Sequence, residues 1–316
     1  MGLKERLYRA TGSGWARAVL ERAPVRVAFR EQGSDATRVV VTIDTEGGFV
    51  GTGERRVWQG SAPDAFQGYV DGIGHARAVL AKHGVPATFF VAPHGLSATG
   101  ATRRAVIDAL AGLRDDGHEV GLHLHPTSDR ALKARVHESY DATAARIPSV
   151  GRRKLVAAGR DLLVEATGVT PRAFRWGNWA LDPESALDVA AEGFAVDSSA
   201  VPGLWDMRFP RHPRYDWRGT RTHRPYQLCD GLREVPISTF SCLGNLFRAD
   251  PVFAPFLRAA LDAHVEAGTP AFVLMTHSSE LTTRDGSPTR ALADLDLFLG
   301  LARALGHPFA TISDVA

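Results

Sequence analysis

His123 and His125 are the residues of this chain whose spacing most directly suggests metal chemistry. They stand two positions apart at the end of an apolar stretch, and residues two apart on a β-strand point to the same face. Leu122 and Leu124 would then pack on the opposite face. Two imidazoles on one face, with a carboxylate nearby, suit zinc or a similar divalent cation. The pattern therefore predicts a metal site, for which the histidine pair by itself is only moderately specific.

Other apolar stretches of the sequence also end in polar residues. Asp44 and Glu46 follow the run Val39–Ile43. Later stretches carry, at or near their ends, Arg175, Asp197 and His277. In an α/β barrel the carboxyl ends of the strands form one rim, and active sites are built on that rim. We therefore expect these side chains to meet the histidine pair at one mouth.

This set of side chains is suited to hydrolysis of an amide. A cation with three protein ligands keeps positions open for water and for a carbonyl oxygen, which it polarises. The reaction also needs a base for the water proton and an acid for the leaving amine. Asp44 is the candidate base and His277 the candidate acid, with Arg175 and Asp197 as charged partners that tune their pKa values. The alternative is that Arg175 and Asp197 simply pair with each other to close the mouth.

The elements that must position these groups alternate along the chain. Apolar runs predict strands over Arg38–Asp44, Ala87–Ala92, Glu119–His125, Arg172–Trp176, Phe194–Asp197, Arg233–Ser238, Ala271–His277 and Phe309–Ser313. Amphipathic runs predict helices over Asp64–His83, Thr102–Asp116, Arg153–Thr167, Pro183–Glu192, Val252–Ala267 and Thr289–Leu305. Helix-ending glycines follow at Gly84, Gly117, Gly168, Gly193, Gly268 and Gly306. This rhythm predicts an α/β protein with a parallel sheet, and seven or eight such units predict a closed barrel.

Composition narrows the class of protein. The chain has 316 residues, of which 44% are hydrophobic and 23% charged, which excludes a disordered chain. No apolar run approaches the roughly 18 residues of a membrane span, and a net charge of +2 does not favour nucleic acid. Two cysteines indicate a reducing compartment, so we expect a cytoplasmic protein. We expect a single barrel domain over 36–316, after a basic helical extension over 1–35 that either packs on the barrel or contacts an anionic membrane surface.

Six ordered segments resemble the polysaccharide deacetylase superfamily, carbohydrate esterase family 4. Thr42–Gly47 is similar to the family's Thr-Phe-Asp-Asp-Gly motif, and Phe174–Asn178 stands where the family has Arg-Pro-Pro-Tyr. The other four similar segments are Gly84–Val91, Gly117–His123, Asp197 and Leu274–His277, and the ending Phe309–Ser313 is also typical of the family. The resemblance runs from about Arg38 to Val315, nearly the whole chain.

The resemblance implies a distorted barrel of seven or eight βα units and a divalent cation, usually zinc. It implies that Asp44 is the general base, oriented by Arg175, and that His277 is the general acid, tuned by Asp197. Backbone N–H groups near Gly177 would help to hold the oxyanion. The implied activity is removal of an N-acyl group, such as acetyl, from an amino sugar or glycan.

Two departures from the family pattern concern the metal ligands. Strict alignment places Thr45 where the family has its acidic ligand, so Glu46, which shares the parity of Asp44, is the predicted ligand. The family's histidines are usually four apart, but position 127 is Thr, so His125 must supply the second imidazole. Glu46, His123 and His125 are thus the predicted metal ligands. The Asp-x-Glu and His-x-His pattern is similar to a divergent branch of the superfamily.

The stretch Pro202–Leu232 has no clear period and is rich in aromatic and basic residues. These are Trp205, Arg208, Arg211, Arg214, Tyr215, Trp217, Arg218, Arg221, Arg224 and Tyr226. Aromatic rings stack on sugar faces and arginines bind carboxylate or phosphate. We expect either a wall of the substrate cleft that favours an anionic or lipid-linked glycan, or an ordinary solvated loop. Two other functions stay open: hydrolysis of a non-sugar amide or imide on the same barrel, and non-catalytic sugar binding.

Overall fold

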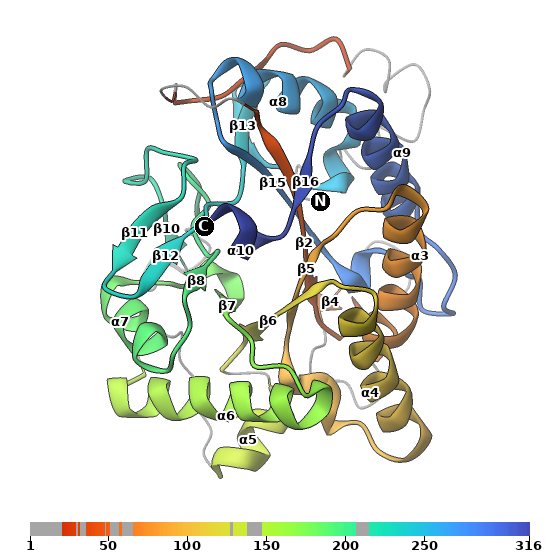
Figure 1. The fold of residues 1–316 in the computed structure, drawn as a ribbon, viewed down its shortest axis with the longest axis vertical. Helices are drawn as coiled ribbons and strands as arrows, with labels where there is room; N and C mark the ends of the chain where they lie inside the picture. The colour runs from red at the N-terminus through yellow and green to blue at the C-terminus, as the bar shows by residue number, and fades with distance from the viewer. Residues whose placement is uncertain are drawn as a thin grey trace.

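A curled β-sheet surrounded by helices forms the centre of the molecule (Figure 1). The structure is a computed structural model that describes residues 21–29, 31, 36–47, 49–50, 57–58, 66–126, 129–137, 147–206 and 215–316. Most of the predicted N-terminal extension, residues 1–20, lies outside this part of the chain. None of the described helices is long and apolar enough to cross a membrane.

The main sheet has the strand order β11-β12-β8-β7-β6-β5-β2-β15, with β16 paired to the first half of β2. All of its pairings are parallel except that of β11 with β12, so the predicted parallel α/β sheet is confirmed. Its strands are β2 (Arg38–Thr45), β5 (Thr88–Val91), β6 (Glu119–Leu124), β7 (Ala173–Trp176), β8 (Val196–Asp197), β11 (Tyr226–Cys229), β12 (Leu232–Glu234), β15 (Ala271–His277) and β16 (Phe309–Ala310). Strand β2 is central, and Val39, Val40 and Val41 are fully buried, as expected for a strand covered on both faces.

The helices fall where the amphipathic runs predicted them. They are α3 (Ile73–His83), α4 (Gly100–Asp115), α6 (Ser149–Thr167), α7 (Pro183–Ala191), α8 (Ala254–Glu266) and α9 (Arg290–Ala304), with α5 (Arg130–Val136) and α10 (Ile312–Val315) not anticipated. One π turn, η1 (Gly68–Gly72), precedes α3, and short 3₁₀ turns are η2 (Pro93–Ser97), η4 (Gly177–Trp179), η5 (Pro251–Phe253) and η6 (Ser278–Glu280). All six predicted helix-ending glycines adopt positive φ, the left-handed conformation that ends a helix at low cost.

The barrel is distorted because strand pairing does not close it among the described residues. The predicted strand Arg233–Ser238 is shorter than expected: β12 ends at Glu234, and Pro236 has no N–H with which to continue a ladder. Beyond β12, Ile237 N donates to Ala200 O at 2.9 Å and so continues the pairing with the β8 side. Ser238 N donates to Val273 O at 3.1 Å, and this bond bridges the gap to β15. The predicted barrel is therefore present in its distorted form rather than as a continuous ring of strands.

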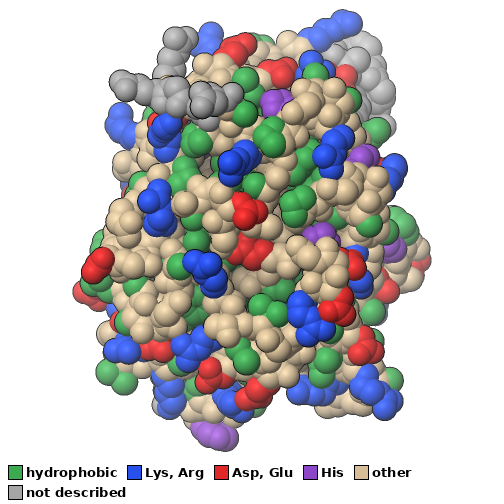
Figure 2. Space-filling model, viewed as in Figure 1, with side chains coloured by type: hydrophobic (Ala, Val, Ile, Leu, Met, Phe, Trp, Pro, Cys, Tyr) green, Lys and Arg blue, Asp and Glu red, His purple; other side chains and the backbone are tan. Residues whose placement is uncertain are grey.

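Smaller sheets lie around the barrel. Strands β1 (Val25–Arg26), β13 (Thr239–Cys242) and β14 (Asn245–Arg248) form one antiparallel sheet, and the hairpins β3 (Phe49–Val50) with β4 (Val57–Trp58) and β9 (Trp205–Asp206) with β10 (Tyr215–Asp216) form two others. On the face shown in Figure 2, Lys and Arg are interspersed with Asp and Glu. This mixture agrees with the small net charge of +2.

The last predicted strand is wrong in its second half. Phe309–Ala310 pairs with β2, but the chain then turns into α10 instead of continuing to Ser313. Asp314 Oδ2 accepts a hydrogen bond from Thr311 N at 2.9 Å, and the Thr311 side chain accepts one from the Asp314 backbone N–H, which together form a capping box. That cap favours a helical turn over an extended chain.

Candidate metal centre and active site

The carboxyl ends of the central strands bring the predicted side chains to one rim. In the parallel register His277 of β15 lies beside Asp44 of β2, and His123 of β6 lies beside Arg175 of β7. Glu46 follows β2 by one residue and is 4% exposed, while Asp44, His123 and Arg175 are each at most 1% exposed. Buried polar side chains cost free energy unless they form hydrogen bonds, and these side chains form them with one another.

Glu46, His123 and His125 converge on a single point. Glu46 Oε1 lies 2.7 Å from His123 Nε2 and 2.8 Å from His125 Nε2, and the two rings stand nearly perpendicular, with their centroids 4.7 Å apart. Burial alone would raise the pKa of Glu46, but the two histidines outweigh it and hold that pKa well below its usual range. The carboxyl group is therefore an ionised oxygen donor that faces two nitrogen donors.

The hydrogen bond on the far side of His123 indicates which ring nitrogen is free. His123 Nδ1 lies 3.0 Å from the Arg175 carbonyl oxygen, which can only accept, so Nδ1 carries the proton. Whenever the ring is neutral, Nε2 has a lone pair directed at the point where Glu46 and His125 converge, so it can bind a cation there. Two imidazole nitrogens and a carboxylate oxygen form a donor set that suits a zinc-like cation. The residues present thus fit the implied metal.

A second group of possible ligands shares one member with the first. Asp44, Glu46 and His277 also bring ligand atoms within 4.8 Å of one another. Arg175 Nη1 already donates to Asp44 Oδ1 at 2.6 Å, and this fixed positive charge opposes a second cation beside it. The geometry therefore favours one ion at Glu46, His123 and His125, with Asp44 held back.

Arg175 is a fully buried guanidinium that fixes Asp44 in place. Besides Asp44, its Nη1 donates to Thr42 Oγ1 at 3.1 Å. Nε donates to the Ser198 carbonyl at 2.7 Å, and Nη2 donates to Ser198 Oγ at 2.8 Å. The guanidinium also lies 4.1 Å from the centre of the Phe90 ring. With Oδ1 of Asp44 occupied, Oδ2 faces the histidine side, 3.8 Å from His123 Nε2.

Asp197 does not stand where the resemblance placed it. Its carboxylate accepts from Ser199 N at 2.8 Å and Ser199 Oγ at 3.1 Å. Its neighbour in the parallel register is Glu234 of β12. Both carboxyl groups are fully buried, and burial raises the pKa of each, with their mutual repulsion adding to the rise at Glu234. Asp197 is therefore bound by Ser199 and lies beside Glu234 in the parallel register, and in the described part of the chain it has no hydrogen bond to His277.

The carboxylate beside His277 belongs to Glu280, which the sequence analysis missed. His277 Nδ1 lies 3.2 Å from Glu280 Oε2. Burial would lower the pKa of His277, but Glu280, Glu46 and Asp44 together raise it above its ordinary value. This arrangement has a simple physical reason. A 3₁₀ turn directly after β15 brings Glu280 back to His277, whereas Asp197 is on β8, which pairs with β12, the strand of Glu234. In the sequence, the only indication of this contact is the His-x-x-Glu spacing of positions 277 and 280.

Gly177 supports His125 from behind, at the turn where the resemblance places an oxyanion site. A Cβ atom at position 177 would lie 2.4 Å from His125 Nδ1, too close for any side chain. The next two residues, Asn178 and Trp179, have positive φ values of 54° and 51°. Non-glycine residues in this region are strained and cluster at functional sites.

We expect Gly177→Ala to displace the His125 ring and to weaken zinc binding by about tenfold or more, the effect of disturbing a ligand's support. Competition with a chromogenic chelator would measure the change. Gly74→Ala is the matched control, because a Cβ atom there meets nothing within 4 Å. Equal zinc affinities for the two variants would contradict this role of Gly177.

The aromatic and basic stretch is only partly described. Arg208, Arg211 and Arg214 lie outside the described residues. Trp217 is 9% exposed and donates from Nε1 to the Trp179 carbonyl at 3.1 Å, so it serves as packing for the η4 turn. Arg218 pairs with Asp216 at 2.5 Å and lies over the Trp205 ring. Substrate binding by this stretch stays a prediction.

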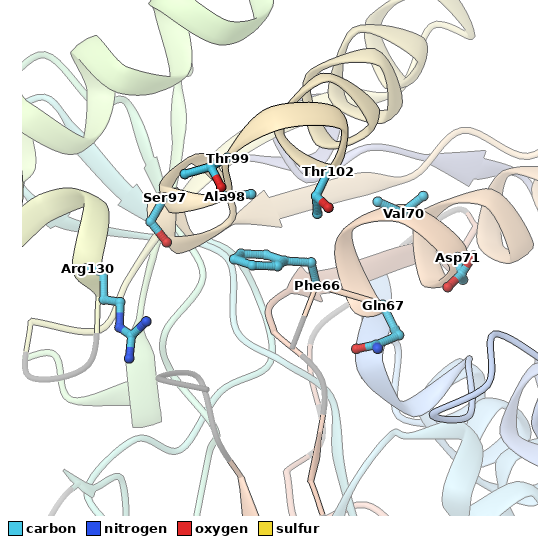
Figure 3. Close-up of a pocket in the computed structure, with 9 residues that line it drawn as sticks. All are labelled: Phe66, Gln67, Val70, Asp71, Ser97, Ala98, Thr99, Thr102 and Arg130. Carbon is cyan, nitrogen blue, oxygen red and sulfur yellow. The ribbon is translucent and has the colours of Figure 1, made fainter. Parts of the chain in front are cut away.

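A cavity of about 550 Å³ opens between η1, the end of η2, the start of α4 and the start of α5. Figure 3 shows the Phe66 ring in its middle, with Arg130 at one end and Asp71 at the other. The Phe66 ring stacks on His94, with their centroids 5.9 Å apart. A Cβ atom at Gly68 of η1 would lie 2.2 Å from the Glu46 carbonyl oxygen, so this wall of the cavity packs directly on the chain at Glu46. The cavity therefore lies on the same side of the barrel as the histidine pair.

No protein-family model matches this sequence, and no curated protein matches it. Among solved structures, the crystal structure of a "putative polysaccharide deacetylase" from Mycobacterium smegmatis is similar with a TM-score of 0.58 and 21% identity, over 92% of this chain and 93% of that chain. The chain shares its fold with that protein. The crystal structure of Puue allantoinase is similar with the same TM-score, 0.58, at 14% identity, over 88% of each chain.

Proposed function

We propose that this protein is a metal-dependent hydrolase of the polysaccharide deacetylase superfamily that removes an N-acyl group from an amino sugar or glycan. One observation carries the proposal: Glu46 Oε1 meets Nε2 of both His123 and His125 directly beside the Arg175–Asp44 pair. A cation donor set next to a buried, fixed carboxylate is what amide hydrolysis by water requires. The six sequence motifs and the shared fold support the same assignment.

Each side chain has a defined part in this reaction. A divalent cation held by Glu46, His123 and His125 would polarise the acyl carbonyl and make water more acidic. Asp44, whose Oδ1 is bound by Arg175, takes the proton of the attacking water on Oδ2. His277 gives a proton to the amine nitrogen as the C–N bond breaks. Zinc as the cation and a cytoplasmic location stay predictions.

The cavity around Phe66 is the proposed binding site for the sugar. An aromatic ring flanked by polar groups suits a pyranose, whose apolar face stacks while its hydroxyls form hydrogen bonds. Arg130 is exposed at one end, where its guanidinium can bind a carboxylate or phosphate. The substrate class we propose is therefore a glycan with an acidic group, either free or attached to a lipid phosphate.

We expect Arg130→Ala to raise KM for an acidic N-acetylated oligosaccharide about tenfold, since a charge-assisted hydrogen bond contributes about 1.5 kcal/mol. The value of kcat should not change, because Arg130 is not among the reacting groups. Steady-state kinetics on acidic and neutral oligosaccharides would measure both. Arg104→Ala removes an exposed arginine outside the cavity and serves as the control. An equal KM for the two variants would exclude Arg130 as an anion contact.

A second candidate function is hydrolysis of a small cyclic amide, because the allantoinase is as similar in fold as the M. smegmatis protein. Metal content measured together with acetate release from N-acetylglucosamine oligomers tests the first proposal. The same enzyme assayed on cyclic ureides and imides tests the second. Acetate release without ureide hydrolysis supports the deacetylase, and the reverse supports the alternative. Sugar binding without release of either product would indicate a non-catalytic relative.

A further inference from the structure

Glu280 lies beside His277, where its carboxylate can accept a hydrogen bond from the imidazole ring. Strand β15 ends at His277, and η6 reverses the chain so that the residue three positions later faces back. Glu280 Oε2 accepts from His277 Nδ1 at 3.2 Å and from Thr276 Oγ1 at 3.4 Å. The side chains of His277 and Glu280 are 18% and 10% exposed, so water screens their contact only weakly.

The turn that carries Glu280 is held from two sides. Thr289 Oγ1 donates to the Glu280 carbonyl at 2.6 Å, and Thr289 is also the N-cap of α9. On the other side, a Cβ atom at Gly72 would lie 2.2 Å from the Ser278 carbonyl oxygen, so η1 packs directly on the turn. The position of the Glu280 backbone relative to β15 is therefore fixed by the barrel rather than by local preference.

The other acidic groups around His277 already have partners. Asp44 is bound by Arg175, and Glu46 faces His123 and His125. Asp197 accepts hydrogen bonds from Ser199 N and Ser199 Oγ. Among the acidic groups that act on His277, Glu280 alone has a hydrogen bond to its ring in the described part of the chain.

We propose that Glu280 is the positioning residue for His277, taking the part that the resemblance gives to Asp197. This inference rests on the proposed function. Glu280 holds the Nδ1 proton, so that Nε2 is directed at the reacting centre and its proton is stabilised. When the C–N bond breaks, its electron pair stays on nitrogen, and the Nε2 proton of His277 moves to that nitrogen. The Nδ1 proton remains with His277, and Glu280 stays ionised throughout.

Glu280→Ala should lower kcat for an N-acetylated amine by about 30-fold, less than the roughly 10²- to 10⁴-fold that a general acid contributes, because His277 itself is still present. KM should change less than about twofold, because Glu280 contacts His277 rather than the substrate. Hydrolysis of 4-nitrophenyl acetate should be nearly unaffected, since 4-nitrophenolate leaves without a proton. Glu280→Asp should recover part of the loss on the amide.

Two further variants separate this role from a structural one. Asp296→Ala removes the carboxylate that lies 2.6 Å from His83 Nε2, an equivalent contact away from the rim, and should leave both substrates' rates unchanged. Equal losses of Glu280→Ala on the amide and on the ester would overturn the proposal. If Asp197→Asn lost activity on the amide but not on the ester, Asp197 rather than Glu280 would be the positioning residue for His277.

Ring ¹⁵N–¹H spectra test the contact without any activity. The Nδ1–H signal of His277, identified by its absence in His277→Gln, should be present in the wild type and lost or shifted in Glu280→Ala. It should persist in Asp197→Asn and in Asp296→Ala. An unchanged signal in Glu280→Ala would overturn the proposal. A wild-type enzyme that hydrolyses no amide but shows the expected signals would instead refute the proposed function.

Discussion

Glu46→Gln should lose the bound metal, whereas Asp44→Asn should keep the metal and lose activity. The amide of Gln removes the negative charge that faces two imidazole nitrogens at 2.7 and 2.8 Å, so the donor set no longer neutralises a divalent cation. Asn at position 44 keeps an oxygen for Arg175 but cannot accept the water proton, which should cost about 10² to 10⁴ in kcat. Metal content by mass spectrometry, measured beside kcat, gives both results.

Each of these two variants is the control for the other. Both replace a buried carboxylate by an amide of the same size at the end of β2, so they disturb packing equally. Loss of metal in Asp44→Asn with retention in Glu46→Gln would reverse the assignment of the two carboxylates. Loss of metal in both would indicate that Asp44 is a fourth ligand.

Arg175→Met should destabilise the protein and reduce the activity that remains. The side chain is fully buried, and its removal leaves Asp44 as an unpaired buried charge. Breaking a buried ion pair on one side costs about 3 to 5 kcal/mol. Urea unfolding would measure that loss, and kcat per metal-loaded molecule should fall because Asp44 is no longer oriented.

Arg152→Met separates the two effects. Arg152 is 2% exposed and donates to Asp188 Oδ2 at 2.5 Å, between α6 and α7 and away from the rim. Its replacement should cost a similar free energy of unfolding while the specific activity stays at the wild-type value. An Arg175→Met enzyme with wild-type specific activity would show that the Arg175–Asp44 pair serves stability alone.

The sequence by itself determined the helices and strands and most of the residues that make up the candidate site. Periodicity 3.6 and helix-ending glycines located the major helices. Apolar runs located every strand of the main parallel array, but the last predicted strand extended beyond β16 into α10. Alternation along β6 predicted that His123 and His125 share a face, and parity along β2 predicted the same for Asp44 and Glu46. These inferences succeed because a side chain's direction within one strand depends only on its own backbone.

The tertiary structure decided which of these groups touch. Nothing local directs Asp197 to Glu234 or Glu280 to His277, since the first contact requires β8 to pair with β12 and the second requires a turn held by α9. The need for glycine at position 177 likewise arises from the His125 ring of a neighbouring strand. Such contacts depend on where strands and loops far apart in sequence meet, and burial then sets the charge that each group carries. The residues of the proposed metal site could thus be named from the sequence, whereas the contact of His277 with Glu280 could not.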